Sequence, residues 1–417
     1  MDSPDWNPLS EIISPGDFVV VKPNLVSSRN LHQKITGDKL EASSTHGSLL
    51  RPILDYALRA TGKTGHVRVV DTPVEGCEID NVTRPLGIHA VIDDLKQSGH
   101  DVAFLDLRYF RVVPKFLLDD VRLWGRSLNL GVLLRKKLPG DPMGYRTVDL
   151  AEQSFFSKPN APQGDRLRFH RSHYETPVVH HTHGRHEYSI PRTVLSADVV
   201  INLPKMKTHK KTGVTLSLKS AIGLSNEKYW LPHFTAGDPS IGGDEYDRPQ
   251  QHTEKLENRL SRFPLPGDHS LVARAPKSDS QPKIIDGSWE GNDTLWRTIL
   301  DLNRILFFID RDGQLQPHPV RKYFTLVDGI VAGEGEGPLG ATPFAAGLLI
   351  GGVNPILVDA VVANTMGFPP EKMPMIREAL GSALLPGSVL GNVQPTQDGP
   401  PLARRFVPPR SWPSLLL

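Results

Sequence analysis

The feature that most limits how this chain can fold is a series of short apolar runs, each bounded by turn residues. Runs rich in Val, Leu and Ile lie at 18–21, 67–70, 102–105, 199–203, 323–327 and 347–350. Continuous apolar runs of this length are typical of strands covered on both faces. Apolar residues at helical spacing occupy 49–59 and 87–96, between the first three runs. The alternation predicts an α/β protein with a parallel or mixed sheet and helices on both faces, plus irregular insertions.

The order of these patterns along the chain predicts its organisation. We expect an N-terminal α/β unit over 1–110, an irregular insertion over 111–190, a region over 191–391 that completes the sheet, and an irregular tail over 392–417. A polar, proline-rich stretch at 247–282 predicts a loop. A further helix is expected at 289–308, where Asn292, Asp293 and Thr294 are residues typical of a helix N-cap.

Composition excludes several classes of function. The chain has 48 Lys and Arg against 46 Asp and Glu, so no overall basic field favours a nucleic-acid partner. Its single cysteine, Cys77, cannot form an intrachain disulfide or a four-cysteine cluster, and it fits a reducing, cytoplasmic location. The first residues do not resemble a secretory signal, and no apolar stretch approaches the ~20 residues of a spanning helix. We therefore expect no integral membrane segment.

Polar side chains follow several of the predicted strands at their carboxyl ends. Parallel strands bring these ends to one edge of the sheet, where ligands of α/β proteins bind. The side chains expected at this edge are Lys22, Asn24, Asp71, Lys205, Lys207, His209 and Asp328. Their number favours a functional site over ordinary strand ends.

The stretch 205–219 is the densest of these segments, with five lysines, one histidine and three threonines after a predicted strand. Ammonium groups supply charge for an anion, while hydroxyl and backbone N–H groups supply donors. The pattern of a P-loop is absent. Two interpretations remain open: an anion-binding segment, favoured by Thr212, Gly213 and Thr215, or a solvated basic loop.

Two other segments offer candidate residues. Trp230 and His233 follow the basic stretch and suit the wall of a pocket or simple packing. Glycines alternate with carboxylates over 328–338, an oxygen-rich setting that hard cations such as magnesium prefer. Asp328, Glu334 and Glu336 are the candidate metal ligands there, and a flexible turn is the alternative interpretation.

Several motifs together resemble one known family. They are Val-Lys-Pro-Asn-Leu at 21–25, the long stretch 197–209 with 212–215 and 218–219, and the closing motifs at 327–330, 333–338 and 355–360. They resemble the domain of unknown function 362 family over roughly 18–380. Many members of that family carry ferredoxin-like cysteine motifs after the domain. The single cysteine here implies no iron–sulfur cluster, so the chain is more similar to the long, cluster-free branch, whose members tend to be encoded among bacterial surface-polysaccharide functions.

The chain also departs from the family pattern at one place, where it has Lys219-Ser220 and the family has Lys-Asn. If an amide binds ligand at that place, Ser220 weakens the transfer of that role to this chain.

These observations favour an enzyme that acts on a small anionic substrate, phosphorylated or carboxylated, with or without a divalent metal. The candidate catalytic residues are His209, Lys207 and Asp71, with His209 as acid or base. The candidate substrate-binding residues are Lys22, Asn24, Lys205, Thr212, Thr215, Lys219, Trp230 and His233. Two alternatives are a non-catalytic binding protein for a nucleotide-sugar or acidic polysaccharide, and a redox partner related to the iron–sulfur members of the family.

Overall fold

The computed structural model describes residues 6–28, 40–123, 126–162, 164–169, 177–247, 283–284, 286–382, 384–385, 402 and 404–416. The predicted loop at 247–282 lies outside these residues apart from its first position, and so do positions 392–401, 403 and 417 of the predicted tail. None of the helices in the described ranges is both long enough and apolar enough to cross a membrane.

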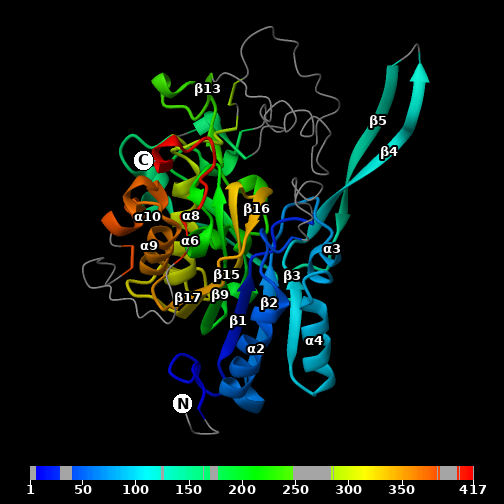
Figure 1. The fold of residues 1–417 in the computed structure, drawn as a ribbon, viewed down its shortest axis with the longest axis vertical. Helices are drawn as coiled ribbons and strands as arrows, with labels where there is room; N and C mark the ends of the chain where they lie inside the picture. The colour runs from blue at the N-terminus through cyan, green and yellow to red at the C-terminus, as the bar shows by residue number, and fades with distance from the viewer. Residues whose placement is uncertain are drawn as a thin grey trace.

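A mixed, mostly parallel sheet forms the centre of the molecule (Figure 1). Five parallel strands lie in the order β3 (Val102–Asp106), β2 (His66–Asp71), β1 (Phe18–Pro23), β9 (Val199–Leu203) and β15 (Lys322–Glu336). Strand β10 (Lys205–His209) follows β9 after Pro204 and also runs parallel to β15. The predicted α/β class is confirmed.

Antiparallel strands complete the sheet at its other side. Strands β16 (Gly340–Phe344) and β17 (Leu348–Gly352) both pair with the long strand β15. Strand β11 (Gly213–Val214) turns back on β10. The sequence predicts a strand over 323–327 that ends at Asp328, but β15 continues to Glu336, because its glycines let other backbone segments pack closely against it.

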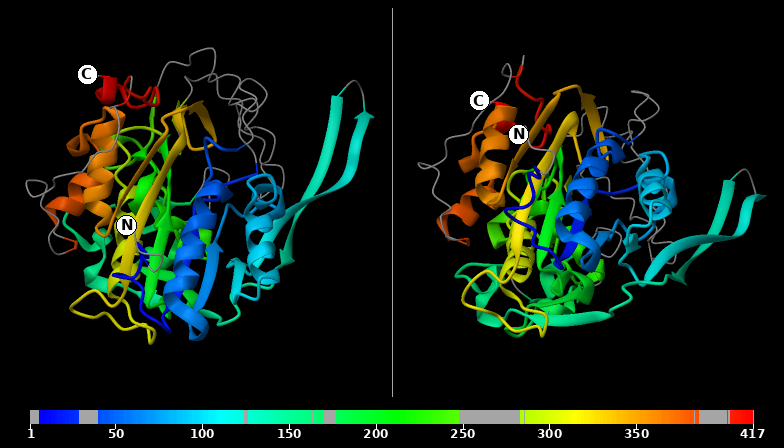
Figure 2. Two further views of the ribbon diagram at one scale, coloured as in Figure 1. Left: turned by 60° about the horizontal axis from the view of Figure 1, so that its bottom comes forward. Right: turned by 90° about the horizontal axis from the view of Figure 1, so that it is seen from below.

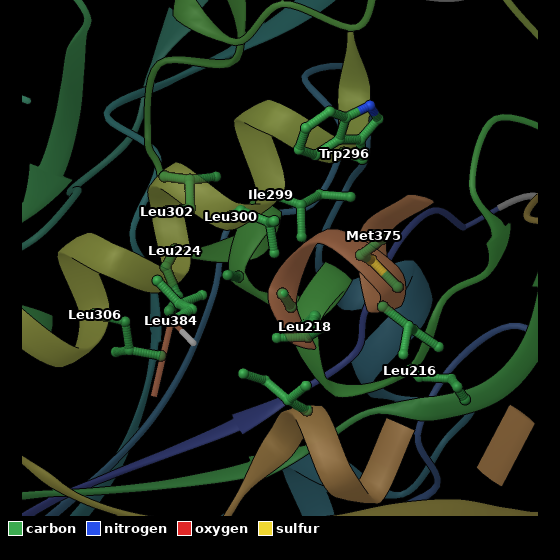
Figure 3. Packing of buried hydrophobic residues seen from close by; sticks show 14 of the residues in the cluster. Leu216, Leu218, Leu224, Trp296, Ile299, Leu300, Leu302, Leu306, Met375 and Leu384 are labelled. Carbon is green, nitrogen blue, oxygen red and sulfur yellow. The ribbon is translucent and has the colours of Figure 1, made fainter. Parts of the chain in front are cut away.

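Helices cover both faces of the sheet because its strands are apolar on both sides. Val19 and Val21 of β1 join one core with α2 (Gly47–Thr61) and α4 (Ile88–Gln97), while Val20 joins the other. That second core contains α6 (Leu216–Ser220), α8 (Leu295–Phe308), α9 (Pro355–Met366) and α10 (Pro374–Gly381). Figure 3 shows Leu216 and Leu218 of α6 among side chains of α8 and Met375 of α10.

The helix expected at 289–308 begins later, at Leu295. Asn292 ends the preceding turn, since its Oδ1 accepts hydrogen bonds from the backbone N–H groups of Thr294 and Leu295. The cap residues were therefore placed correctly, and the helix starts after them.

The stretch 111–190 contains more regular structure than the sequence indicates. Strands β4 (Phe110–Leu123) and β5 (Arg126–Lys137) form a hairpin that projects from the rest of the molecule (Figure 2).

Three shorter antiparallel pairs lie within this stretch or beyond it. They are β6 (Tyr145–Asp149) with β8 (Glu187–Pro191), β7 (Leu167–Arg168) with β12 (Phe234–Thr235), and β13 (Tyr246–Asp247) with β14 (Lys283–Ile284). The remaining α-helices of the described residues are the short α3 (Asp80–Thr83) and α5 (Arg192–Leu195).

Candidate functional site

Two lysines at the carboxyl edge of the sheet form buried ion pairs. Lys22 Nζ lies 3.0 Å from Asp71 Oδ1, and Lys205 Nζ lies 2.9 Å from Asp328 Oδ2. All four side chains are at most 3% exposed. Each aspartate also accepts backbone hydrogen bonds, for example from Leu25 N to Asp71 Oδ2 at 2.7 Å. The charge of each lysine is thus balanced within the fold.

The basic stretch 205–219, for which a solvated loop is one interpretation of the sequence, begins as the buried strand β10. Lys207 is fully buried and donates a hydrogen bond to the backbone oxygen of Ser43. Burial and the nearby charges of Lys219 and Lys205 lower the pKa of Lys207 well below its ordinary value. The interpretation as a solvated loop is therefore wrong for the first part of this segment.

The next part of the segment is the short helix α6, which three long-range contacts hold in place. The carboxylate of Asp359 accepts hydrogen bonds from Ser217 N at 2.7 Å and Leu218 N at 2.8 Å, so it caps the start of the helix. Thr215 N donates to Lys207 O at 2.9 Å, and Asn202 Nδ2 donates to Ser217 O. Residues of the motifs at 197–209 and 355–360 therefore position α6.

At α6 and its N-cap, one ammonium group and two hydroxyl groups, those of Thr215 and Ser220, have no hydrogen-bond partner within the described residues. Within the described part of the chain, no acceptor lies at hydrogen-bond distance from the Lys219 ammonium, and the buried Oγ1 of Thr215 is also unpartnered. Thr215 is the N-cap residue of α6 and Lys219 lies in the helix itself. Burial and the charges of Lys211 and Lys22 lower the pKa of Lys219 to about 8.

Two lysines that the sequence did not single out belong to the same group. Lys228 Nζ donates to Thr72 Oγ1 at 2.7 Å and to the backbone oxygen of Ile222, and burial lowers its pKa to about 7. Lys211 Nζ lies 3.9 Å from Asp286 Oδ2 and 5.1 Å from the centre of the Phe234 ring. We call the six side chains Lys22, Lys205, Lys207, Lys211, Lys219 and Lys228 the lysine cluster. The charges of other lysines in the cluster lower the pKa of Lys207, Lys219 and Lys228.

The segment after α6 packs directly on the first ion pair of the cluster. A Cβ atom at Gly223 would lie 2.4 Å from Asp71 Oδ1 and 2.5 Å from Lys22 Nζ, and Gly223 O accepts a hydrogen bond from Thr72 N. Only glycine leaves room for this approach. The sequence offers no signal for it, because Gly223 lies in an ordinary apolar stretch.

Two histidines adjoin the lysine cluster and differ in which ring nitrogen has a partner. His209 Nδ1 accepts a hydrogen bond from Lys211 N at 3.1 Å, which leaves the proton of the neutral ring on Nε2. His233 Nδ1 lies 2.8 Å from Leu231 O and donates to it, which leaves an Nε2 lone pair. Burial lowers the pKa of each ring well below its ordinary value, and the lysines lower it further. Both rings are therefore neutral near pH 7.

Three of the predicted binding residues are engaged in packing or turns. Asn24 Nδ2 donates to Ser43 O at 3.0 Å, and Thr212 Oγ1 donates to Val214 O within the β10–β11 hairpin. Trp230 stacks on the ring of His180, with 3.5 Å between the ring centres. Among the described residues, no hydrogen bond joins these three side chains to a lysine of the cluster.

The three predicted metal ligands are not brought together. Asp328 pairs with Lys205, Glu334 accepts two hydrogen bonds from Arg404, and Glu336 lies 3.1 Å from Lys210 Nζ. No group of three or more His, Cys, Asp or Glu side chains suited to a metal ion occurs among the described residues. The glycines of this stretch serve the fold, since a Cβ at Gly333 or Gly337 would meet the backbone oxygen of Ala42 or Thr208.

Comparison with known proteins agrees with this arrangement of motifs. The family model described as domain of unknown function (DUF362) matches residues 147–364, which include β9, β10, α6, β15 and Asp359. This α/β chain belongs to the domain of unknown function 362 family. No curated protein matches the chain.

Proposed function

We propose that this protein is an enzyme that acts on a small anionic substrate, phosphorylated or carboxylated, bound at the lysine cluster. The observation that carries the proposal is the unbalanced charge on α6. The two buried aspartates of the cluster already pair with Lys22 and Lys205, while Lys219 has no acceptor among the described residues. An anion beside Lys219 and Thr215 would supply the missing partner.

The physical argument rests on the cost of burying charge. An ammonium group removed from water without an anionic partner is destabilising, and a depressed pKa is the usual consequence. The pKa of Lys219, lowered to about 8, is such a consequence of burial and of Lys211 and Lys22. A bound phosphate or carboxylate would relieve this cost and accept a hydrogen bond from the Thr215 hydroxyl.

The histidines favour an enzyme over a simple binding protein. His209 offers an Nε2–H donor and His233 an Nε2 lone pair, so the two neutral rings provide one proton donor and one acceptor beside the same lysines. A general acid and a general base need this division of roles. A binding protein for a nucleotide-sugar or acidic polysaccharide would use the same lysines but would not require the histidines.

Calorimetric titration with inorganic phosphate and with pyrophosphate tests the anion site. Lys219→Met is expected to weaken binding at least tenfold, equivalent to about 1.4 kcal/mol. The matched control is Lys96→Met, because Lys96 lies exposed on α4, and its affinity should equal that of the unaltered protein. Equal affinity in Lys219→Met and Lys96→Met would contradict the proposal.

A further inference from the structure

The last described segment of the chain, 404–416, lies against the end of the long strand β15, and we call it the strap. Glu334 holds its first part, because this carboxylate accepts hydrogen bonds from the Arg404 guanidinium at 2.6 and 2.9 Å and from Val407 N at 2.9 Å. Gly335 N donates to Val407 O at 2.8 Å. The first part of the strap is thereby tied to the sheet.

The second part of the strap meets the turn that follows β10. Arg410 N donates to Glu336 Oε1 at 2.9 Å, and Lys210 Nζ lies 3.1 Å from Oε2 of the same carboxylate. Trp412 is 1% exposed, and its Nε1 donates to Lys210 O at 2.7 Å. Its ring packs closely on Gly213, where a Cβ atom would lie 3.2 Å from Trp412 Cζ3. Trp412 therefore ties the turn to the strap.

The turn that Trp412 holds carries two residues of the candidate site. His209 ends β10 on the same side of the strand as the buried Lys207, since alternate residues of a strand point to one side. Lys211 N donates to His209 Nδ1 at 3.1 Å. The backbone of Lys210 lies between these two residues, so its position sets where the side chains of both are presented.

We propose that Trp412 is a positioning residue for the candidate site, and that docking of the strap and binding of an anion at the lysine cluster favour one another. This inference rests on the proposed function and adds to it a residue some two hundred positions away in the chain. The bond from Trp412 to Lys210 O holds His209 and Lys211 in place for the anion. Because coupling between two sites is reciprocal, an anion that fixes the turn also fixes the strap.

Calorimetric titration with inorganic phosphate compares Trp412→Phe with the unaltered full chain. Phenylalanine keeps an aromatic ring at this buried place but has no Nε1–H to donate to Lys210 O. We expect the affinity for phosphate to fall by about fivefold or more, the lower range of ordinary coupling between sites. The matched control is Trp6→Phe, because Trp6 is 40% exposed and lies against Tyr56 of α2. Its affinity should equal that of the unaltered protein.

Hydrogen–deuterium exchange with peptide mass spectrometry separates positioning from a general loss of packing. In Trp412→Phe the amides of 205–214 should exchange faster, while those of α2 and α4, which belong to the other hydrophobic core, should keep their rates. Saturating phosphate should slow exchange in the strap of the unaltered protein, which a purely structural role of Trp412 does not predict.

A second variant reaches the same turn without changing the core. Glu336→Gln removes the charge that faces Lys210 and keeps an oxygen that can accept from Arg410 N. It should also speed exchange at 205–214 and weaken phosphate binding, by less than Trp412→Phe does.

Each outcome supports or overturns the inference. Faster exchange at 205–214 with unchanged phosphate affinity would overturn the positioning role, and equal acceleration in α2 and α4 would make Trp412 an ordinary core residue. If phosphate binds the unaltered protein but leaves exchange in the strap unchanged, the coupling fails and the anion site stands. If the unaltered protein does not bind phosphate, the anion site fails and the coupling fails with it.

Discussion

Two parts of the lysine cluster balance their charge in different ways. On the sheet, Lys22 and Lys205 each face an aspartate at 3.0 Å or less, and the pairs are almost completely buried. On α6, Lys219 has no anionic or neutral acceptor in the described part of the chain, although it lies in the same neighbourhood. The charges of the two sheet lysines are therefore balanced within the fold, whereas the proposed function assigns the helix lysine to a ligand.

The largest expected effect comes from breaking a sheet pair. Asp328→Asn leaves the Lys205 ammonium buried without an anion and should lower the free energy of unfolding by about 3–5 kcal/mol. Urea-induced unfolding measures this loss in the free energy of unfolding. The matched control is Asp94→Asn, which removes the exposed pair between Arg51 and Asp94, where the side chains are 42% and 56% exposed. That change should leave the free energy of unfolding almost unchanged, because exposed ion pairs contribute little, and an equal loss in both variants would contradict the distinction between buried and exposed pairs.

A smaller effect is expected where the chain packs on the other sheet pair. Gly223→Ala places a methyl group against Asp71 and Lys22, so we expect a loss of about 1–3 kcal/mol in the free energy of unfolding. Gly381→Ala is its control, because no atom lies within 4 Å of the Cβ position at Gly381 near the end of α10. If Gly223→Ala and Gly381→Ala had the same free energy of unfolding, the close packing at Gly223 would not contribute to stability.

Much of the fold follows from local patterns in the sequence. Each of the apolar runs at 18–21, 67–70, 102–105 and 199–203 is a strand of the sheet, because Val- and Ile-rich segments covered on both faces have few other ways to bury their side chains. The helices at 49–59 and 87–96 are also present: α2 extends two residues further at each end, and α4 begins and ends one residue later than predicted. The run at 347–350 forms the antiparallel β17, shifted by a residue or two.

The candidate site was harder to predict, since its contacts join residues far apart in the chain. Strand β10 has only Met206 as an apolar residue, and its lysines become buried only because Asp328 and Ser43 meet them. In the same way, Arg404 donates two hydrogen bonds to Glu334, which lies seventy positions earlier in the chain. Lys219 was singled out from the sequence, but its lack of a partner is a property of the folded chain.

The smallest expected change in stability is also the most direct test of the central claim, that the half-buried Lys219 has no partner within the described part of the chain. It is the free energy of unfolding of Lys219→Met and of the unaltered protein, measured from pH 7 to pH 10.5 in a buffer without phosphate or carboxylate. Below about pH 8 the amine is charged in both the folded and unfolded chain, and the full cost of its burial is present. Between about pH 8 and 10.5 the Lys219 amine keeps its proton in the unfolded chain and has lost it in the folded chain, so the stability of the unaltered protein rises relative to the variant.

We predict that Lys219→Met is at least as stable as the unaltered protein at pH 7 and that this advantage shrinks as the pH rises. A loss of several kcal/mol at pH 7, like that expected for Asp328→Asn, would show that Lys219 has a partner in the fold and would contradict the claim.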